Sequence, residues 1–358
     1  MPANIPGDSL VLVQISDLHM SDQLECSVLT GAKGLRGHDP QLCRLLVTRI
    51  RSIAKHYRVP TSDLRWIISG DLTRVGAPAE FAVAKDFIET VPALDPLGRP
   101  LRPTLGIPRR RYVEVPGNHD HFDGWDEQSI WRSGTKNPPP AWNPQIFGAN
   151  VTRTVWDNLP QPWTSAYGSI QLELFGVDSN SGLAGQTANR RAAGEIAPAE
   201  FAQLEDALRT SNRRPASRGV TVVRAIICHH AFTKKPQSGI LKASPLTAGS
   251  VQQLREIAAK YRVPAILTGH THAVNFQRED VPVARCGEKT VTLCPVYEIR
   301  CPTTLQGIAD ALVHGFWVHH LFRPSPKAEL IWRPRLYLLA AGRLHSQPVA
   351  DCEDLVLP

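Results

Sequence analysis

Aspartate, asparagine and histidine residues gather in five short clusters that lie far apart in the chain. The clusters are Asp17-Leu18-His19, Gly70-Asp71, Gly117-Asn118-His119-Asp120, His229-His230 and Gly269-His270-Thr271-His272. Oxygen and imidazole ligands without thiolate suit manganese, iron, zinc or cobalt. Two such ions roughly 3.5–4 Å apart need a shared ligand, and a carboxylate is the natural bridge. The residue types therefore predict a site for two metal ions.

The charge of this ligand set favours reactive metal ions over structural ones. If Asp17 and Asp71 are its only charged members, two divalent ions keep a surplus of about two positive charges. Asn118 and the histidines are neutral ligands that preserve the surplus. Such a surplus can bind a phosphate oxygen and convert a bridging water into a hydroxide nucleophile. The chemistry that these residues predict is the hydrolysis of a phosphate ester.

Each cluster directly follows a segment with the composition of a buried β-strand. These expected strands are residues 9–15, 65–69, 111–115, 221–228 and 265–268. In open α/β sheets, ligands bind outside the carboxyl ends of the strands, so the five clusters can converge on one crevice. Glycine before Asp71, Asn118 and His270 permits tight turns and close approach of the backbone.

The remaining pattern indicates helices between these strands and strands alone afterwards. Asp39 and Pro40 are an N-cap and first residue for a helix over 40–57, and further helices are expected at 78–89 and 198–210. Ser250 and Gln253 form a capping box for a helix to about residue 261. After His272 only strands are expected, at 274–278, 290–297, 316–322 and 329–332, which predicts an α/β architecture closed by antiparallel strands.

The ordered set DLH, GD, GNHD, HH and GHTH resembles the calcineurin-like metallophosphoesterase superfamily across residues 17–272. The resemblance implies two packed mixed β-sheets flanked by helices, which is a four-layer αββα sandwich. It also implies which residues bind metal. Asp17, His19, Asp71 and His272 would hold the first ion, and Asp71, Asn118, His229 and His270 the second.

The same resemblance assigns roles at the phosphate. His119, with Asn118, would contact the phosphate, and His119 would stabilise or protonate the leaving oxygen. His230 either faces the phosphate or caps its strand, and Asp120 is either a carboxylate that orients an imidazole or a loop residue.

One departure from the protein Ser/Thr phosphatases of the superfamily bears on the substrate. Arg74 stands where their GDxxDRG motif has its second aspartate, and Asp120 stands where they have glutamate. The GDLT form with Glu80, and the paired histidines, more closely resemble bacterial cyclic-nucleotide and glycerophosphodiester phosphodiesterases. We therefore expect a phosphodiesterase that hydrolyses a small phosphodiester. The alternatives are a nuclease or phosphomonoesterase with the same site, and a non-catalytic interaction module on this fold.

Composition adds limited information about partners and location. The 358 residues include 40 Lys/Arg and 33 Asp/Glu, and the net charge of +7 fits an anionic substrate. The basic residues are spread along the chain, so nucleic acid is a possible partner that the sequence does not favour. The seven cysteines are scattered, and no apolar run is long enough for a membrane span. Together with the absence of a signal-like N-terminal segment, this predicts a cytoplasmic protein.

The expected domain organisation is one phosphoesterase domain over residues 1–323 and a C-terminal strand extension over 324–358. A Trp-rich insertion at about 121–161 contains Trp125, Trp131, Trp142 and Trp156, and either packs on the core or caps the metal site. His319 and His320 lie in an apolar segment and are expected to be structural rather than ligands.

Overall fold

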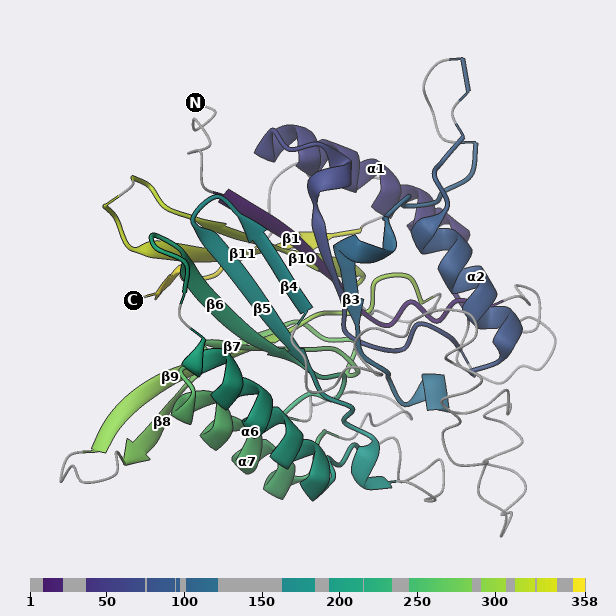
Figure 1. Cartoon of the computed structure of the whole chain (residues 1–358). Coiled ribbons are helices and arrows are strands. Elements are labelled where there is room, and N and C mark those ends of the chain that lie inside the picture. The colour runs from purple at the N-terminus through teal and green to yellow at the C-terminus, as the bar shows by residue number, and fades with distance from the viewer. Residues whose placement is uncertain are drawn as a thin grey trace, which may run out of the picture.

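The computed structural model arranges the chain as two β-sheets with helices on their outer faces (Figure 1). It describes residues 9–21, 37–74, 76–93, 95–96, 101–121, 163–183, 193–214, 216–233, 245–284, 291–306, 313–325, 327–339 and 350–357. The predicted Trp-rich insertion, apart from residue 121, lies outside these described residues.

The first sheet has seven strands and carries three of the five clusters. Its strands are β1 (Ser9–Ile15), β2 (Arg65–Ile68), β3 (Tyr112–Glu114), β10 (Gly315–Phe322), β11 (Leu330–Leu338), β12 (Ala350–Asp351) and β13 (Leu355–Leu357). Their order is β12-β11-β10-β1-β2-β3, and β13 pairs with β11. Because β1, β2 and β3 are parallel, their carboxyl ends lie at one edge of the sheet, where the DLH, GD and GNHD clusters begin.

The second sheet has six strands and carries the other two clusters. Its strands are β4 (Trp163–Tyr167), β5 (Ile170–Gly176), β6 (Thr221–Ile227), β7 (Ala265–Thr268), β8 (Asn275–Ala284) and β9 (Val291–Arg300). Their order is β4-β5-β6-β7-β9-β8. β5, β6, β7 and β9 are parallel, so the HH cluster after β6 and the GHTH cluster after β7 are neighbours.

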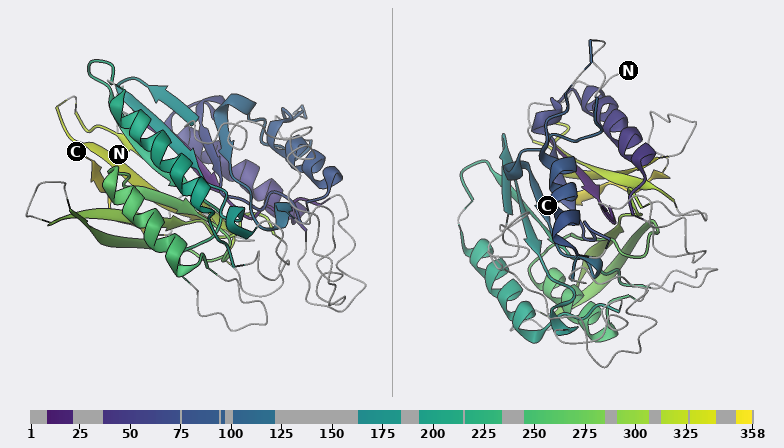
Figure 2. Two further views of the ribbon diagram at one scale, coloured as in Figure 1. Left: turned by 60° about the horizontal axis from the view of Figure 1, so that its bottom comes forward. Right: turned by 90° about the vertical axis from the view of Figure 1, so that its right-hand side faces the viewer.

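In the described part of the chain, helices cover the outer faces of the two sheets, as Figures 1 and 2 show. An apolar cluster joins α1 (Pro40–Tyr57) and α2 (Pro78–Glu89) to the first sheet, and another joins α6 (Pro198–Arg213) and α7 (Ala248–Lys260) to the second. A third fills the space between the sheets. β1 is buried on both faces, since Val11 packs toward the helices and Leu10 toward the second sheet. The expected αββα sandwich is confirmed.

The sequence explains where α1 begins and ends. The Asp39 side chain accepts a hydrogen bond of 2.7 Å from the Gln41 backbone N–H, and Pro40 occupies the first turn. Arg58 ends the helix in the left-handed conformation, with φ of 54°. Apolar residues at helical spacing, among them Leu42, Leu46, Ile50 and Ile53, face the first sheet. The cap predicted from the sequence is therefore present.

The capping box predicted at Ser250 is wrong. Helix α7 already begins at Ala248 after Thr247, so Ser250 lies within its first turn. The Ser250 hydroxyl instead accepts hydrogen bonds from the Ile196 backbone N–H (3.2 Å) and the Thr247 hydroxyl (2.9 Å). A contact with the preceding loop therefore replaces the expected contact within the helix. Arg111 also differs from expectation, because it ends a 3₁₀ turn (Arg109–Arg111) and the strand starts at Tyr112.

The described strands after residue 324 belong to the first sheet. β10 pairs with β11 along its whole length, and β12 and β13 pair with β11. Trp332 and Leu355 are buried between the sheets. These strands follow the predicted boundary at residue 323, which stays a prediction. Within the described residues, no helix is both long and apolar enough to cross a bilayer.

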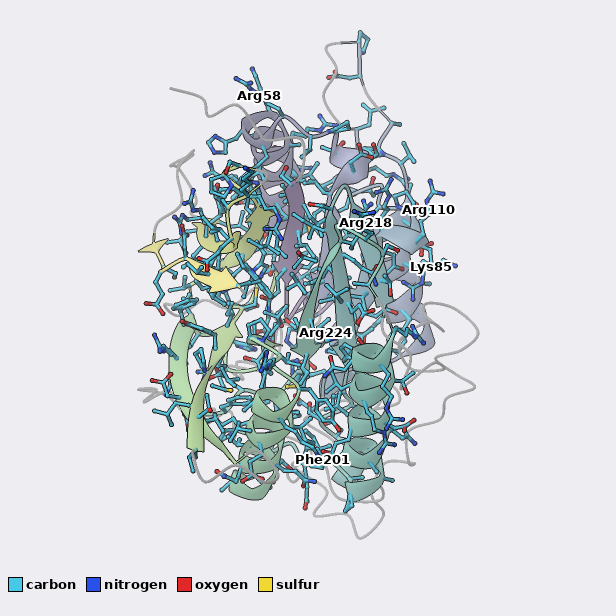
Figure 3. The ribbon with its side chains drawn as sticks, turned by 60° about the vertical axis from the view of Figure 1, so that its left-hand side comes forward. Arg58, Lys85, Arg110, Phe201, Arg218 and Arg224 are labelled. Atoms are coloured by element: carbon cyan, nitrogen blue, oxygen red, sulfur yellow. The ribbon has the colours of Figure 1, made fainter. Side chains whose placement is uncertain are left out.

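Exposed basic residues come from several different elements (Figure 3). Arg58 follows α1, Lys85 lies on α2, Arg110 lies in the 3₁₀ turn before β3, and Arg218 lies in the turn before β6. Arg224 lies on β6 and is partly buried. Whether a nucleic acid binds this chain therefore stays a prediction.

Candidate metal centre

Backbone hydrogen bonds tie four of the cluster loops together. The Asp17 N–H donates to Gly70 O at 3.0 Å and joins the loops after β1 and β2. In the second sheet, Gly269 N–H donates to His229 O at 2.9 Å and joins the loops after β6 and β7. The His270 N–H donates to Asp17 Oδ2 at 3.1 Å and so connects the two sheets. The expected convergence of separate strand ends is therefore what the fold produces.

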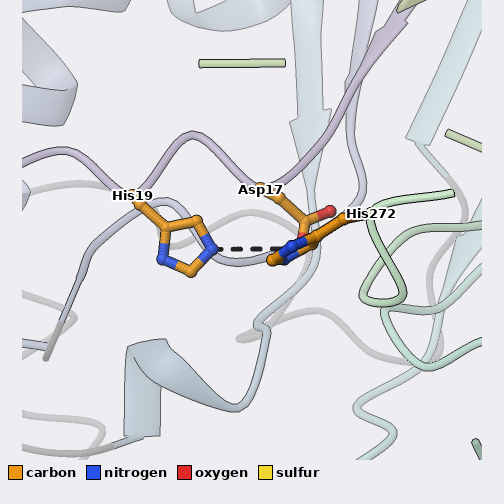
Figure 4. A group of neighbouring side chains, drawn as sticks. All are labelled: Asp17, His19 and His272. Atoms are coloured by element: carbon orange, nitrogen blue, oxygen red, sulfur yellow. Dashed lines mark ion pairs between the residues drawn. The ribbon is translucent and has the colours of Figure 1, made fainter. Parts of the chain in front are cut away.

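Asp17, His19 and His272 form one group of candidate metal ligands (Figure 4). His272 Nε2 lies 3.2 Å and His19 Nε2 4.0 Å from Asp17 Oδ1. The other oxygen, Oδ2, accepts from the Ser16 hydroxyl at 2.5 Å. One oxygen is thus held by protein donors while Oδ1 faces two imidazoles, as the set proposed for one metal ion requires.

Asp71 lies between this group and a second one. Its Oδ2 is 3.6 Å from His19 Nε2 and 3.3 Å from His229 Nε2. Its Oδ1 accepts a hydrogen bond of 2.9 Å from the His119 backbone N–H. Asp71 belongs to one candidate ligand group with His19 and His119 and to another with His229 and His270. This position suits a carboxylate shared by two metal ions.

His229 and His270 are oriented toward each other. His229 Nδ1 donates to Ser69 O at 2.8 Å, because a carbonyl oxygen can only accept, and this leaves Nε2 facing Asp71. His270 Nδ1 lies 3.2 Å from His229 Nε2. A second hydrogen bond that fixes the tautomer and ring orientation is the usual support of a metal-binding histidine.

Several buried polar atoms of the centre lack a hydrogen-bond partner. They are Asp17 Oδ1, both ring nitrogens of His19 and Asn118 Oδ1. Burial of polar atoms without a partner costs free energy, so such atoms are rare in folded proteins. All four belong to residues that the sequence pattern assigns to metal. The donor set and these atoms therefore fit a pair of metal ions.

The backbone of the centre is strained. Among described residues other than glycine, those with positive φ are Asp17, His19, Arg58, Asp71, Arg262, His270 and His272. Five of the seven are predicted metal ligands. Such conformations cost on the order of 1 kcal/mol or more each and persist where the surrounding structure enforces them, often at functional sites.

Two glycines allow the loops to approach the ligands closely. Gly70 has φ of 97°, and a Cβ there would lie 2.3 Å from His229 Nδ1. A Cβ on Gly117 would lie 2.0 Å from Asp71 Oδ1. Both distances are far below any real carbon contact. The glycines predicted to permit close approach therefore lie directly against the ligand side chains.

Burial and charge set the protonation of these groups. Burial raises the pKa of Asp17, but the interaction with the nearby His272 ring outweighs it, and the pKa lies at about 2. Burial lowers the pKa of His229, but the charge of Asp71 outweighs it and raises the pKa to about 9. Burial lowers the pKa of His270 to about 3. Metal binding at His229 therefore has to displace a proton.

His119 is held in one orientation. Its Nδ1 donates to Arg74 O at 2.6 Å. The His119 and His19 rings are in edge contact, with centroids 4.6 Å apart. With Nδ1 committed to a carbonyl, Nε2 is the nitrogen that can exchange a proton with a bound ester. The Arg74 guanidinium pairs with Glu80, Nε to Oε1 at 3.2 Å, so this side chain is held by a carboxylate.

Asp120 fastens two cluster loops to each other rather than orienting an imidazole. Its Oδ1 accepts from the Thr73 N–H (2.9 Å) and hydroxyl (2.8 Å), and its Oδ2 accepts from the Gly117 N–H (2.9 Å) and Leu72 N–H (3.2 Å). Burial, and then the charge of Asp71, raise the pKa of Asp120 to about 6. Asp120 therefore connects the GD loop to the GNHD loop.

The end of β5 contributes residues that the sequence pattern did not single out. The Ser179 hydroxyl lies 2.8 Å from His230 Nδ1, and the His230 ring lies 4.3 Å from the His270 ring between centroids. Asp178 Oδ1 lies 3.4 Å from His121 Nε2. His230 is fully buried beside a predicted ligand, and whether it contacts substrate stays a prediction. The sequence signal for this sixth cluster is Asp-Ser-Asn at 178–180, just after the apolar segment that forms β5, the same pattern as at the other five clusters.

Two further expectations concern residues outside the centre. Arg111 pairs with Asp63, Nη2 to Oδ1 at 3.3 Å, at the amino end of β3 and so at the opposite end of the sheet from the clusters. His319 is buried between Gln14 Oε1 (3.0 Å from Nε2) and the Trp332 indole N–H (3.1 Å from Nδ1). Both ring nitrogens have protein partners, as expected of a structural histidine.

Comparison with known proteins identifies the family. Residues 10–274 match the calcineurin-like phosphoesterase family, and the chain belongs to it. No curated protein sequence matches the chain. Solved structures of similar shape include GAP50, the anchor in the inner membrane complex of Plasmodium, at TM-score 0.48 and 12% identity over 96% of this chain and 90% of that one.

Two other structures of similar shape have enzymatic names. A dimetal phosphatase from Danio rerio has TM-score 0.47 and 12% identity over 97% of this chain and 98% of that one. The purple acid phosphatase PPD1 of yellow lupin has TM-score 0.43 and 12% identity over 95% of this chain and 53% of that one.

Proposed function

We propose that this calcineurin-like phosphoesterase is a binuclear phosphodiesterase that hydrolyses a small phosphodiester, a cyclic nucleotide or a glycerophosphodiester. The observation that carries the proposal is the position of Asp71 between two groups of candidate ligands. Asp71 Oδ2 is within 3.6 Å of His19 Nε2 and 3.3 Å of His229 Nε2. In this assignment Asp17, His19, Asp71 and His272 hold one ion, and Asp71, Asn118, His229 and His270 hold the other.

Two metal ions bound there would supply positive charge that polarises the phosphoryl group and activates water as the nucleophile. The protein supplies their placement. Asp17 and Asp71 are the carboxylates among the assigned ligands, and both have a second oxygen held by a protein donor. Two carboxylates do not neutralise two divalent ions, so positive charge would remain for the ester. The protein donors to the second carboxylate oxygens fix the positions of Asp17 and Asp71 and so of this charge.

His119 is the proposed acid for the leaving oxygen. The Arg74 carbonyl accepts its Nδ1–H, so the Nε2–H of the imidazolium form is the proton available to the leaving oxygen. As the leaving oxygen develops negative charge, a proton from Nε2 neutralises it. Asn118 precedes His119 in the same loop, and its buried Oδ1 has no protein partner. We assign Asn118 to the second ion and to the substrate phosphate beside it.

The charge near the centre favours a diester over a monoester. A monoester carries up to two negative charges at neutral pH, whereas a diester carries one. Among the described residues, two arginines at the cluster loops are each paired with a glutamate, Arg74 with Glu80 and Arg300 with Glu298. Their charges are thus largely compensated within the protein, which suits a substrate with a single negative charge.

We further propose manganese, iron or zinc as the metals, because the ligands are oxygens and imidazoles without thiolate. The proposed partner is a small phosphate ester rather than a nucleic acid, because the basic residues are spread along the chain without one dominant cluster. We also keep the cytoplasm as the proposed location.

The test compares two chromogenic esters on protein stripped of metal and reloaded with Mn²⁺. We expect bis(p-nitrophenyl) phosphate to be cleaved with a higher kcat/KM than p-nitrophenyl phosphate. A preference for the monoester would contradict the diester assignment and indicate a phosphatase. No cleavage of either ester by protein with two bound ions would contradict the enzyme assignment for these substrates, and salt-dependent DNA or RNA cleavage would indicate a nuclease.

A further inference from the structure

A buried ion pair on β9 contacts both metal-ligand loops of the second sheet. Glu298 and Arg300 are two residues apart on the strand, so their side chains lie on the same face. They are 3% and 2% exposed, and Arg300 Nη2 lies 3.1 Å from Glu298 Oε1. β9 neighbours β7 in the sheet, and Arg300 is the register partner of Thr268, the last residue before the GHTH loop.

Arg300 reaches both loops through hydroxyl groups. Its Nη1 donates to Thr271 Oγ1 at 3.2 Å, and Thr271 lies between His270 and His272. Its Nη2 donates to Thr233 Oγ1 at 2.9 Å, in the loop that begins with His229. The planar guanidinium has donors in fixed directions, so one side chain sets the distance between the two hydroxyls.

Glu298 fastens the same two loops from the other side of the pair. Its Oε1 accepts from the Phe232 backbone N–H at 3.0 Å and from the Thr268 hydroxyl at 3.1 Å. Its Oε2 accepts from Asn275 Nδ2 at 3.1 Å. Both charges are thus satisfied by hydrogen bonds as well as by each other, which is what a buried ion pair needs.

Stability alone is a weak reason for such a pair, because apolar residues of similar volume often replace buried ion pairs without loss. The Glu298–Arg300 pair has a net charge of zero, whereas a single buried charge at this position would change the affinity of the nearby centre for cations. The remaining role is geometric. The second ion would take His229 and His270 from these two loops, whereas the first would take only His272 from them.

We propose that Glu298 and Arg300 are positioning residues that hold the HH loop and the GHTH loop at the separation required by the second metal ion. This inference rests on the metal assignment proposed above. Loss of the pair leaves the ligands present but lets His229 and His270 move apart. Outer partners of metal ligands typically change affinity 10–100-fold. The second ion is therefore weakened by about this factor, and the first much less.

The experiment titrates stripped protein with Co²⁺ and follows its visible absorption, which requires no substrate. His19→Ala and His229→Ala identify the steps that belong to the first and second ions. The test variants are Arg300→Met and Arg300→Lys. The unpaired Glu298 of Arg300→Met would by itself favour cation binding and so oppose the expected weakening, whereas Arg300→Lys keeps the charge opposite Glu298. The matched control is Arg224→Met, which removes an ion pair with Glu173 in the same sheet (Nε to Oε2 3.3 Å). The described contacts of Arg224, which Figure 3 labels, run to β5 and α6 and not to the metal-ligand loops.

Arg300→Met is expected to raise the dissociation constant of the second ion about 10–100-fold, while Arg224→Met leaves both ions near wild type. Should Arg300→Met fail to fold by circular dichroism, Arg300→Lys keeps the charge opposite Glu298 and loses the fork, and the same selective weakening is expected. Wild-type affinity for the second ion, or equal weakening of both ions in the Arg300 and Arg224 variants, would overturn the inference. Wild-type protein that binds fewer than two ions would overturn the metal assignment and this inference together, whereas loaded protein that cleaves no ester would overturn only the proposed activity.

Discussion

Adding one methyl group at Gly117 tests whether the position of Asp71 matters. A Cβ there would lie 2.0 Å from Asp71 Oδ1 and 2.3 Å from Asp71 N, whereas real Cβ contacts are not shorter than 3.0 Å. Gly117 is not among the described residues with positive φ, so alanine is compatible with its backbone. In Gly117→Ala, Asp71 or the GNHD loop therefore has to move by about 1 Å. A displacement of this size at a catalytic centre costs about 100-fold in rate.

The assay is kcat/KM for bis(p-nitrophenyl) phosphate together with the metal content after dialysis. The control is Gly249→Ala, because no atom lies within 4 Å of a Cβ at that position. Gly249 lies in α7, where alanine is favoured over glycine by about 0.5–1 kcal/mol. We expect Gly117→Ala to lose activity about 100-fold and Gly249→Ala to keep it. Equal activity and metal content in the two variants would refute the close-packing argument.

Two further substitutions test the acid and the buried histidine of the first sheet. His119→Asn is expected to lower kcat about 10²–10⁴-fold with metal content retained, measured by turnover and elemental analysis, and loss of an ion would show that His119 is a ligand. Burial lowers the pKa of His319 to about 3, so the unfolded chain takes up a proton below its ordinary pKa of 6.5 while the folded chain does not. This proton uptake does not affect the free energy of unfolding above pH 6.5, and it lowers that free energy as the pH falls from 6.5 toward 3. Between pH 7 and pH 5, the free energy of unfolding of His319→Gln, measured in urea, should therefore fall by about 2 kcal/mol less than that of wild type. An unchanged pH dependence in this variant would contradict the buried, neutral histidine.

The sequence predicts the layers because local patterns determine them. β1 is apolar on both faces since it packs between helices and a second sheet, and its bounds match the prediction at both ends. The prediction is poorer for the β8–β9 hairpin. Asn275–Ala284 and Val291–Arg300 are longer than expected because the pairing of the two strands continues through charged residues such as Glu279 and Arg300.

The candidate site was predictable where its residues lie in short motifs, and not where contacts cross the fold. The sequence left two alternatives for Asp120, a carboxylate that orients an imidazole or a loop residue, and its hydrogen bonds run to the GD loop and to its own GNHD loop. Ser250 fits a capping box, but its hydroxyl contacts Ile196 in the loop before α6. Glu298 and Arg300 lie in a strand that carries no motif, and only sheet order places β9 beside β7. Such contacts depend on strand order, which sequence spacing does not specify.

The most direct test of the central claim is the metal stoichiometry of Asp71→Ala compared with His229→Ala and wild type. Asp71 Oδ2 faces histidines of both ligand groups, so we predict that wild type binds two ions and His229→Ala one. Asp71→Ala should lose both ions from the centre and all turnover of bis(p-nitrophenyl) phosphate. An Asp71→Ala protein that keeps two ions, or that turns over the diester at the wild-type rate, would contradict the account.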